Sequence, residues 1–402
     1  MRDLGVIEGG CLAAADGRIV FAGPRRDFEA EVVLSPDAVI LDGSDRIVLP
    51  GFIDAHTHLA FAGSRHEEFA LRLEGTSYEE IAARGGGILS TVRETRAALG
   101  SNLDEAIAGR LDQMLLQGTT TCEAKSGYGL TLESELGLLD SLKRAAASHP
   151  MDVAGTLLGA HSIPPEYRDN RAAYVRLVAE EMVPAAAAAG FARYCDVFCE
   201  RSVFSVDESR TILLAGKAHG LAPRVHADQL SDSGGSALAA ELGAASADHL
   251  DHAGNDGIRA LAAAGVSAGL LPGATFCLKS PVHAPARRLI EAGVSVFLAT
   301  DLNPGTSRTE SMQAILALGV MMLDLSVEEA IAATTLNAAH SLQAGSDRGS
   351  LQAGRRADFI VMDVPHYLHT VYHFGVNHVE TVVKDGRVVV EDGILVYDVD
   401  EE

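Results

Sequence analysis

The sequence predicts an α/β fold: a (β/α)8 TIM-like barrel with a small discontinuous β-sandwich domain formed by both chain ends. The middle of the chain alternates β-branched apolar runs with Ala/Leu-rich helical runs. Both ends carry only short strand-like runs between turn residues. Polar side chains recur where one predicted strand after another ends, and a closed barrel gathers all those ends on one rim.

The small domain is predicted from runs that share one pattern at opposite ends of the chain. Residues 17–23 and 38–43 have it near the start, and residues 358–362 and 379–387 have it near the finish. We therefore expect one β domain from residues 1–48 plus 352–402, built around a barrel of residues 49–351. A chain of 402 residues suffices for both.

The barrel is predicted from eight apolar runs of strand length. Their ends are expected near His56, Lys125, His161, Glu200, His226, His249, Leu271 and Asp301. From the second strand onward these ends lie 22 to 39 residues apart, as whole βα units require. The longer first interval contains residues 85–87, three glycines that we interpret as a flexible turn rather than a hinge over the barrel mouth.

Composition excludes several classes of partner. A formal net charge of -23 argues against binding nucleic acid, although local cations still permit an anionic substrate. No stretch reaches the roughly 18 apolar residues of a membrane span. The 5 Cys are odd in number and sit mostly in apolar runs, which favours buried thiols in a reducing cytoplasm.

A metal site is predicted where the strands end. His56 and His58 follow an apolar run, and residues i and i+2 of a strand face the same side. Further strands end in His226, His249 and Asp301, and a carboxylate there is costly unless it is paired or binds a metal. We expect His56, His58, His226 and Asp301 to hold one ion, either Zn²⁺ or Fe²⁺/Fe³⁺.

The same residues predict hydrolysis by a metal-activated hydroxide, because such an ion lowers the pKa of its water to about 7. Asp301 would accept the proton and later deliver it, and His249 would stabilise an oxyanion or shuttle a proton. Sites with two metals need a bridging carboxylate, often a carbamylated Lys on the fourth strand. That strand ends in Cys199 and Glu200, and Lys125 ends the second, so we favour one metal over a Glu200 bridge.

Six runs, residues 56–69, 125–130, 159–167, 196–200, 226–229 and 299–307, resemble the imidazolonepropionase family of the amidohydrolase superfamily. The resemblance covers nearly the whole chain in order. His-x-His belongs to the superfamily at large, whereas Gly-Ser-Arg at 63–65, Lys-Ser-Gly-Tyr-Gly at 125–129 and Asp-x-Asn-Pro-Gly at 301–305 are more particular to this family.

The resemblance implies hydrolysis of the ring amide of 4-imidazolone-5-propanoate to N-formimidoyl-L-glutamate in histidine degradation. It implies that Arg65 pairs with the substrate carboxylate, a planar bidentate cation for an anion. Similar enzymes are often homodimers. The other implied substrate contacts are Tyr128, His161 and Gln229 on the ring, and Asn303, Gly305 and Thr306 on the glutamate portion of the product.

Two features depart from the family pattern. The opening strand usual in the family is short or missing, which leaves the edge of the small domain open. Gln229 stands where some members carry Glu. We therefore expect Asp301 to act as the base with His249 assisting, and Gln229 to contribute hydrogen bonds.

Two other functions remain open at this point. A deaminase of a cytosine- or guanine-like ring would use the same metal ligands but would need no clamp such as Arg65 for a carboxylate. A non-catalytic scaffold would keep the barrel, but such chains typically lose their metal ligands, whereas all four stand here.

Overall fold

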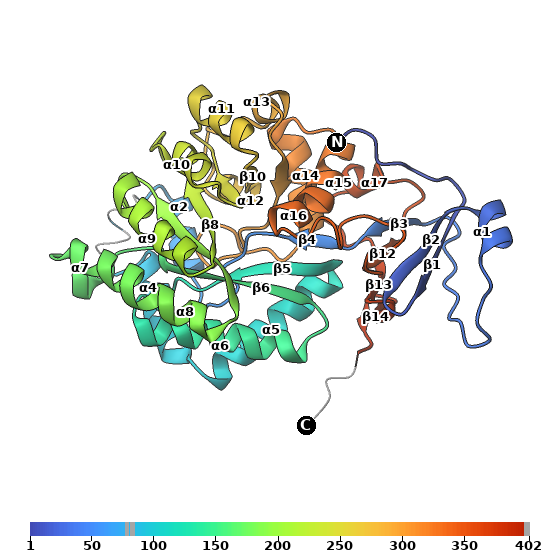
Figure 1. The fold of residues 1–402 in the computed structure, drawn as a ribbon, viewed down its shortest axis with the longest axis horizontal. Coiled ribbons are helices and arrows are strands. Elements are labelled where there is room, and N and C mark those ends of the chain that lie inside the picture. The colour runs from blue at the N-terminus through green and yellow to red at the C-terminus, as the bar shows by residue number, and fades with distance from the viewer. Residues whose placement is uncertain (77–79, 81–84, 398–402) are drawn as a thin grey trace.

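The computed structural model describes residues 1–76, 80 and 85–397. Within these residues a parallel eight-stranded sheet runs in the order β4 to β11. This sheet confirms the predicted barrel strands (Figure 1). Their bounds are β4 Phe52–Asp54, β5 Thr119–Lys125, β6 Asp152–Ala160, β7 Ala192–Cys199, β8 Ala222–Ala227, β9 Ser246–His249, β10 Ser267–Leu270 and β11 Val296–Leu298.

The first and last strands of this sheet meet and close it into a barrel. The Asp301 backbone N–H donates to the carbonyl of His56 at 3.0 Å, and the His58 N–H donates to the carbonyl of Leu302 at 2.9 Å. The segments after β4 and β11 therefore run side by side at the carboxyl end. Two distant parts of the sequence thus bring His56, His58 and Asp301 to one place.

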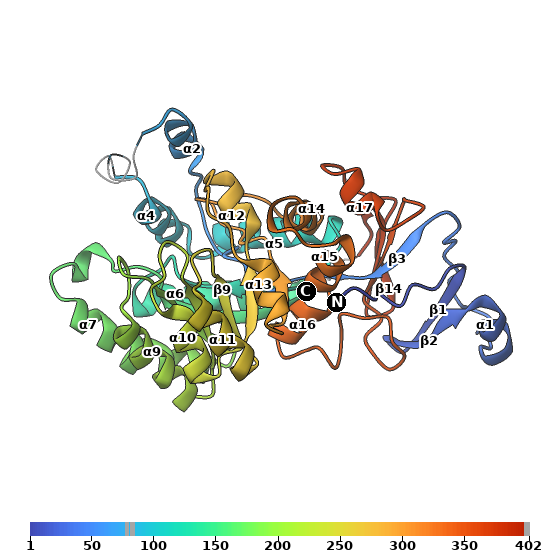
Figure 2. The same cartoon turned by 90° about the horizontal axis from the view of Figure 1, so that it is seen from above.

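Helices lie on the outside of the barrel strands (Figures 1 and 2). Two of them, α9 and α15, begin with capping boxes, formed by Ser205 with Glu208 and by Ser326 with Glu329. None of the described helices is long and apolar enough to cross a bilayer. The helices are α1 Arg25–Glu31, α2 His66–Leu73, α4 Ile88–Ala98, α5 Ser101–Leu116, α6 Leu132–Ser148, α7 Arg171–Arg176, α8 Val183–Ala189, α9 Val206–Ala218, α10 Gly235–Leu242, α11 Asn255–Ala264, α12 Pro272–Cys277, α13 Ala286–Glu291, α14 Met312–Leu323, α15 Val327–Thr334, α16 Leu336–Ser341 and α17 His369–Tyr372, with a 3-10 turn at Pro165–Tyr167 and a π-helical stretch at Leu177–Met182.

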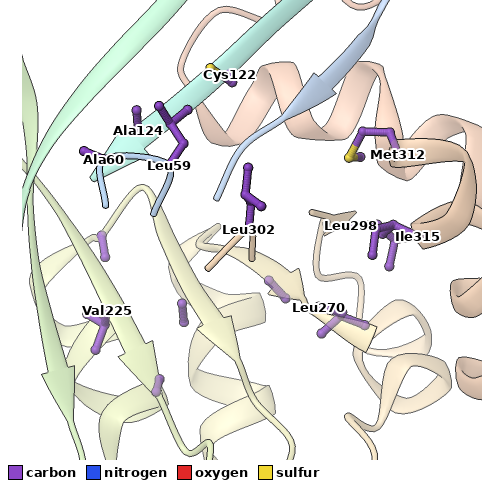
Figure 3. Close-up of a cluster of buried hydrophobic side chains, with 14 of the residues drawn as sticks. Leu59, Ala60, Cys122, Ala124, Val225, Leu270, Leu298, Leu302, Met312 and Ile315 are labelled. Carbon is purple, nitrogen blue, oxygen red and sulfur yellow. The ribbon is translucent and has the colours of Figure 1, made fainter. Parts of the chain in front are cut away.

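The main core fills the space between strands and helices. Figure 3 shows Leu298 of β11 beside Met312 and Ile315 of α14. All three side chains are fully buried, and each such burial stabilises the fold by roughly 1.5–3 kcal/mol. This packing fixes the strand that leads into Asp301.

The small domain unites both ends of the chain, as predicted. In the described residues a five-stranded antiparallel sheet pairs β3 (Ile47–Pro50) with β12 (Phe359–Met362), followed by β13 (Val379–Lys384), β14 (Arg387–Glu391) and β15 (Ile394–Leu395). A hairpin of β1 (Gly10–Ala15) and β2 (Arg18–Pro24) lies at the same end of the molecule (Figures 1 and 2). Its Ile19 packs with Phe359, Val361 and Val383. The limits 1–48, 49–351 and 352–402 remain a prediction.

The expected strand at residues 38–43 is wrong. This run is irregular, and the side chains of Val39 and Ile40 are 81% and 76% exposed. A strand needs a neighbour for its backbone groups, and no described strand pairs with this run. A short apolar run between turn residues was therefore a misleading signal here.

Candidate active site at the carboxyl end of the barrel

Five of the predicted site residues meet at the carboxyl end of the strands. His56 and His58 follow β4, His226 lies in β8, His249 ends β9, and Asp301 lies three residues after β11. All five are at most 3% exposed. The strand-end rule that predicted them therefore holds for their location.

Their donor atoms have the spacing of a metal centre. His58 Nε2 lies 3.3 Å from His226 Nε2 and 3.4 Å from Asp301 Oδ1, and His56 Nε2 lies 3.6 Å from the same oxygen. Two donors bound at about 2.05 Å to one ion, at an angle of about 90° to 120°, lie roughly 2.9 to 3.6 Å apart. These three separations match the spacing of donors around one ion, and His56, His58 and Asp301 form one group whose possible ligand atoms lie within 4.8 Å of one another. His249 also belongs to a group with His56 and His226 in which the possible ligand atoms lie within 4.8 Å of one another.

The ring nitrogens that face this centre are kept free. His56 Nδ1 lies 2.8 Å from Asp248 Oδ2, and His226 Nδ1 lies 3.0 Å from Asp196 Oδ2. A carboxylate beside Nδ1 holds the proton there and leaves the Nε2 lone pair for a metal. His56 Nε2 is indeed buried without a hydrogen-bond partner. This open nitrogen lies beside further imidazoles and a carboxylate, which are the donor types that zinc and iron prefer.

Burial also keeps these histidines neutral. It lowers the pKa of His56 and of His58 well below the ordinary value, and the pKa of His249 to about 3. At neutral pH they need not lose a proton before they bind a metal.

Two positive backbone angles aim side chains into the centre. Strand alternation would send the neighbours Asp248 and His249 to opposite faces. His249 has φ 75°, which breaks the alternation, so both residues are fully or nearly buried around His56. Asp301 has φ 52°. A non-glycine residue in this region costs about 1 kcal/mol or more, and such strain concentrates at functional sites.

Two buried cations support the carboxylates that touch the histidines. Lys125 Nζ lies 2.9 Å from Asp196 Oδ2 and 2.8 Å from Glu123 Oε1. Burial lowers the pKa of Lys125, but Asp196 and Glu123 outweigh burial and raise it above its ordinary value. Arg224, also fully buried, lies 3.4 Å from Asp248 Oδ2 and donates to the carbonyl of Ala55. Each histidine partner is thus itself held by a cation.

Predicted ring contacts lie on one side of this centre. His161 stacks on His58 with ring centroids 4.9 Å apart, and Tyr128 lies 5.3 Å from His161. The His161 Nδ1 donates to the carbonyl of Gly127 at 3.1 Å, which leaves Nε2 as an acceptor. A Cβ on Gly127 would meet that Nδ1 at 3.0 Å, so the loop needs glycine there.

The loop after Asp301 is fixed by its own side chains. Asn303 accepts from the N–H groups of Gly305 and Thr306 and donates to the carbonyl of Asp301. Arg65 lies against this loop, because a Cβ on Gly305 would meet Arg65 Nη1 at 2.2 Å. The structure therefore brings Arg65, Asn303, Gly305 and Thr306 together.

Gln229 and Glu200 behave differently from the strand-end histidines. The Gln229 side chain is half-buried and makes no hydrogen bond with the described residues. Glu200 accepts through one oxygen from the N–H groups of Leu230 and Ser231, and through the other from the N–H of Arg201. Both Glu200 oxygens are engaged in holding this loop, which argues against a bridge between two metals.

The sequence did not reveal the supporting role of five residues behind the ligands: Asp196, Asp248, Arg224, Lys125 and Asp54. Asp54 accepts from the N–H and hydroxyl of Thr300, which fixes the residue before Asp301, and burial raises the pKa of Asp54 to about 7. A signal was present, because Asp54, His56 and His58 share one strand face, as do Arg224 and His226. The alternation of side chains along a strand predicts which residues face inward, but it does not predict which residues of other strands they contact.

Comparison with known proteins agrees with this geometry. Residues 47–389 match the sequence model of the Amidohydrolase family. The imidazolonepropionase of Symbiobacterium thermophilum is 52% identical over 394 residues, which cover 98% of this chain and 93% of that protein. The imidazolonepropionase of Geobacillus kaustophilus is 48% identical over the same shares of both chains.

Solved structures agree on the fold. The 5-methylcytosine deaminase of Klebsiella pneumoniae, liganded with phosphonocytosine, has a TM-score of 0.74 at 18% identity and covers 97% of this chain and 96% of that one. A zinc-bound adenosine deaminase of Xanthomonas campestris has a TM-score of 0.72, also at 18% identity, and covers 97% and 90%. At such identity the likeness shows the fold alone. The sequence matches go further: the chain belongs to the amidohydrolase family and, within it, to the imidazolonepropionases.

Proposed function

We propose that this chain hydrolyses the ring amide of 4-imidazolone-5-propanoate to N-formimidoyl-L-glutamate, in histidine degradation. The observation that carries the proposal is a cluster of four metal-type donors. In it His58 Nε2 lies 3.3 Å from His226 Nε2 and 3.4 Å from Asp301 Oδ1, and His56 Nε2 lies 3.6 Å from that oxygen. The loop that leaves this cluster at Asp301 meets a guanidinium, that of Arg65, beside Gly305. Relatives named imidazolonepropionase at 42% to 52% identity over nearly the whole chain support the same substrate.

His56, His58, His226 and Asp301 would hold a single ion, either zinc or iron. When bound, the ion supplies Lewis acidity, which polarises the ring carbonyl and lowers the pKa of water. Its ligands support this role, since imidazole and carboxylate suit both metals.

The chain itself would move the proton. The Asp301 carboxylate would accept a proton from the water that attacks the ring carbonyl carbon, and it would deliver that proton to the nitrogen released when the C–N bond breaks. His249 would stabilise the oxygen that gains negative charge, and Gln229 would donate a hydrogen bond to the polar edge of the ring.

The substrate would lie between two groups of side chains. Tyr128 and His161 would hold the ring, and their stacking on the histidine cluster supports this. Arg65 would pair with the propionate carboxylate. The loop after Asp301 would contact the glutamate portion of the product through Asn303, Gly305 and Thr306. The same three residues would keep Arg65 and the loop backbone in place.

The direct test is an assay of metal-loaded protein with freshly prepared imidazolonepropionate, read as loss of the ultraviolet absorbance of the ring. Arg65→Ala should raise KM about a hundredfold, since a charge-assisted pair is worth about 2–3 kcal/mol. No turnover of this substrate, combined with deamination of a neutral nucleobase that is indifferent to Arg65→Ala, would favour a deaminase instead.

We also propose a homodimer in the cytoplasm. Five free cysteines, three of them buried, support a reducing compartment. Light scattering of the purified chain measures the oligomeric state, and a monomeric mass would remove that part of the proposal.

A further inference from the structure

We infer that Glu68 is a positioning residue that fixes the guanidinium of Arg65 edge-on, so that the opposite edge faces the carboxylate of the substrate. Glu68 lies on α2 and touches no other predicted site residue among the contacts of the described chain. The inference rests on the proposed function, because it assigns the carboxylate to Arg65.

The contact between the two side chains uses one edge of the guanidinium. Glu68 Oε2 accepts from Arg65 Nε at 2.8 Å and lies 2.8 Å from Nη2. A planar guanidinium offers a second edge, which Nη1 shares with Nη2. Arg65 Nη1 has no hydrogen-bond partner among the described residues. The edge formed by Nε and Nη2 is therefore bound by Glu68, and the edge formed by Nη1 and Nη2 remains available to a ligand.

Glu68 is itself anchored from behind. Its Oε1 accepts from the N–H of Gly87 at 3.0 Å, at the start of α4. The Ser90 hydroxyl lies 3.2 Å from the same oxygen and shares its one proton with the Gly87 carbonyl. Gly87 has φ 79°, a conformation that favours glycine, so this backbone N–H is aimed by the turn that the sequence predicts at residues 85–87. The Glu68 carboxylate is thus held by a helix N-terminus as well as by Arg65.

The free edge of Arg65 points at the loop that leaves Asp301. A Cβ on Gly305 would lie 2.2 Å from Nη1, so only glycine leaves room for the guanidinium there. The carbonyl of Gly305 in turn accepts from Arg72 Nη2 at 2.9 Å. The Arg65 side chain is 14% exposed, so water screens its charge only partly.

A carboxylate beside Arg65 could instead compete with the substrate. Two contacts argue against competition: Glu68 occupies the edge away from Nη1, and its other oxygen is bound to Gly87 and Ser90. Removal of the Glu68 charge should therefore allow the Arg65 side chain to rotate, which weakens substrate binding. It should not make Arg65 more available to the substrate. The sign of the change in KM separates the two roles.

The test compares Glu68→Gln with Glu67→Gln, the exposed neighbour on the same helix. Steady-state kinetics with imidazolonepropionate should give Glu68→Gln a KM about tenfold higher at nearly unchanged kcat, which corresponds to about 1.4 kcal/mol. Glu67→Gln should match the wild type. Ser90→Ala, which removes one anchor of Glu68 and leaves the charges intact, should raise KM about twofold.

A second readout separates positioning from general damage to the fold. With the neutral methyl ester of the substrate, Glu68→Gln and wild type should have equal KM, because there is no carboxylate to position. A lower KM for Glu68→Gln on the acid, an equal loss on acid and ester, or a KM equal to that of Glu67→Gln would each overturn the inference. If the wild type fails to turn over the acid at all, it is the proposed function that has failed.

Discussion

Two networks of buried charge lie at opposite ends of the barrel strands, and they differ in how far the protein itself supplies partners for their charged and polar groups. Where the barrel meets the small domain, Lys384 Nζ lies 3.0 Å from Asp152 and 3.3 Å from Asp358, and it also pairs with Asp385. At the carboxyl end, His56 Nε2 is buried without any hydrogen-bond partner, beside His58 and Asp301.

The difference indicates that the junction network serves the stability of the fold and the carboxyl-end network serves activity. A buried cation that meets three carboxylates is satisfied by the protein itself, and its loss leaves charges unpaired. A buried imidazole nitrogen left open among other metal-type donors indicates a missing ligand, whereas Asp358 Oδ2 at the junction, although it also has no partner, belongs to no such group in the described residues. Substitutions at the domain junction should therefore act on unfolding, and substitutions at the carboxyl end should act on metal binding and turnover.

The largest effect should come from Asp301→Asn. It keeps the shape of the side chain but removes a charged ligand and the predicted proton acceptor, so kcat/KM should fall at least about a thousandfold. Thermal unfolding of the metal-free variant should stay within a few degrees of wild type, which unfolding scans with and without metal will measure. If Asp301→Asn lost stability as well as activity, the carboxyl-end network would be stabilising like the junction network, and the distinction between them would be wrong.

The next effect should appear at the other network. Lys384→Met leaves Asp152 and Asp358 without their shared cation, and because Asp152 is partly exposed we expect a loss of about 2 kcal/mol in the free energy of unfolding. Urea denaturation measures it. The variant should keep kcat/KM within about twofold, and a tenfold loss of activity would erase the distinction between the two networks.

A smaller effect should follow from Asp248→Asn. The carboxylate beside His56 Nδ1 fixes the ring and its proton, and loss of such a partner typically weakens metal affinity about tenfold to a hundredfold. Competition with a chromophoric chelator measures the affinity. Unchanged affinity would mean that Asp248 only fills the space behind His56.

The smallest effect is a difference in pH dependence. Burial lowers the pKa of His249 to about 3, so below about pH 6.5 the unfolded chain binds a proton there that the folded chain does not. The free energy of unfolding of the metal-free wild type should therefore fall relative to His249→Asn by about 1 kcal/mol per pH unit from pH 6.5 downward.

The junction should respond in a lower pH range. Burial raises the pKa of Asp152, but Lys384 and Arg348 outweigh burial and lower it, so its contribution is lost only as pH falls below about 4. Urea titrations from pH 7.5 to 3.5 measure both. A wild type and His249→Asn that keep a constant difference between pH 6.5 and 5 would contradict the assignment of a neutral buried imidazole.

Local patterns predicted the barrel and the location of its site because each depends on the end of one strand. His56, His58, His226 and Asp301 could be named because a closed barrel leaves their order around the rim little freedom. The partner of His56 could not, because Asp248 and His249 both face inward only through the positive φ of His249. The strand predicted at residues 38–43 was wrong for a related reason: a short apolar run between turn residues has strand composition but does not supply a neighbouring strand.

The role of Glu68 could not be predicted from the sequence, for a third reason. A Glu three residues after an Arg on a helix is most often a surface ion pair, and nothing local distinguishes Glu68 from Glu67. Only the tertiary contacts to Gly87 and Ser90 do so.

The central claim is that side chains from three distant stretches of the chain hold one ion. Crystals grown with zinc, with data collected at the zinc absorption edge, test it most directly. We expect one anomalous peak per chain at about 2.0–2.2 Å from His56 Nε2, His58 Nε2, His226 Nε2 and one Asp301 oxygen. Two peaks bridged by Glu200, or a single peak held by other residues, would contradict it.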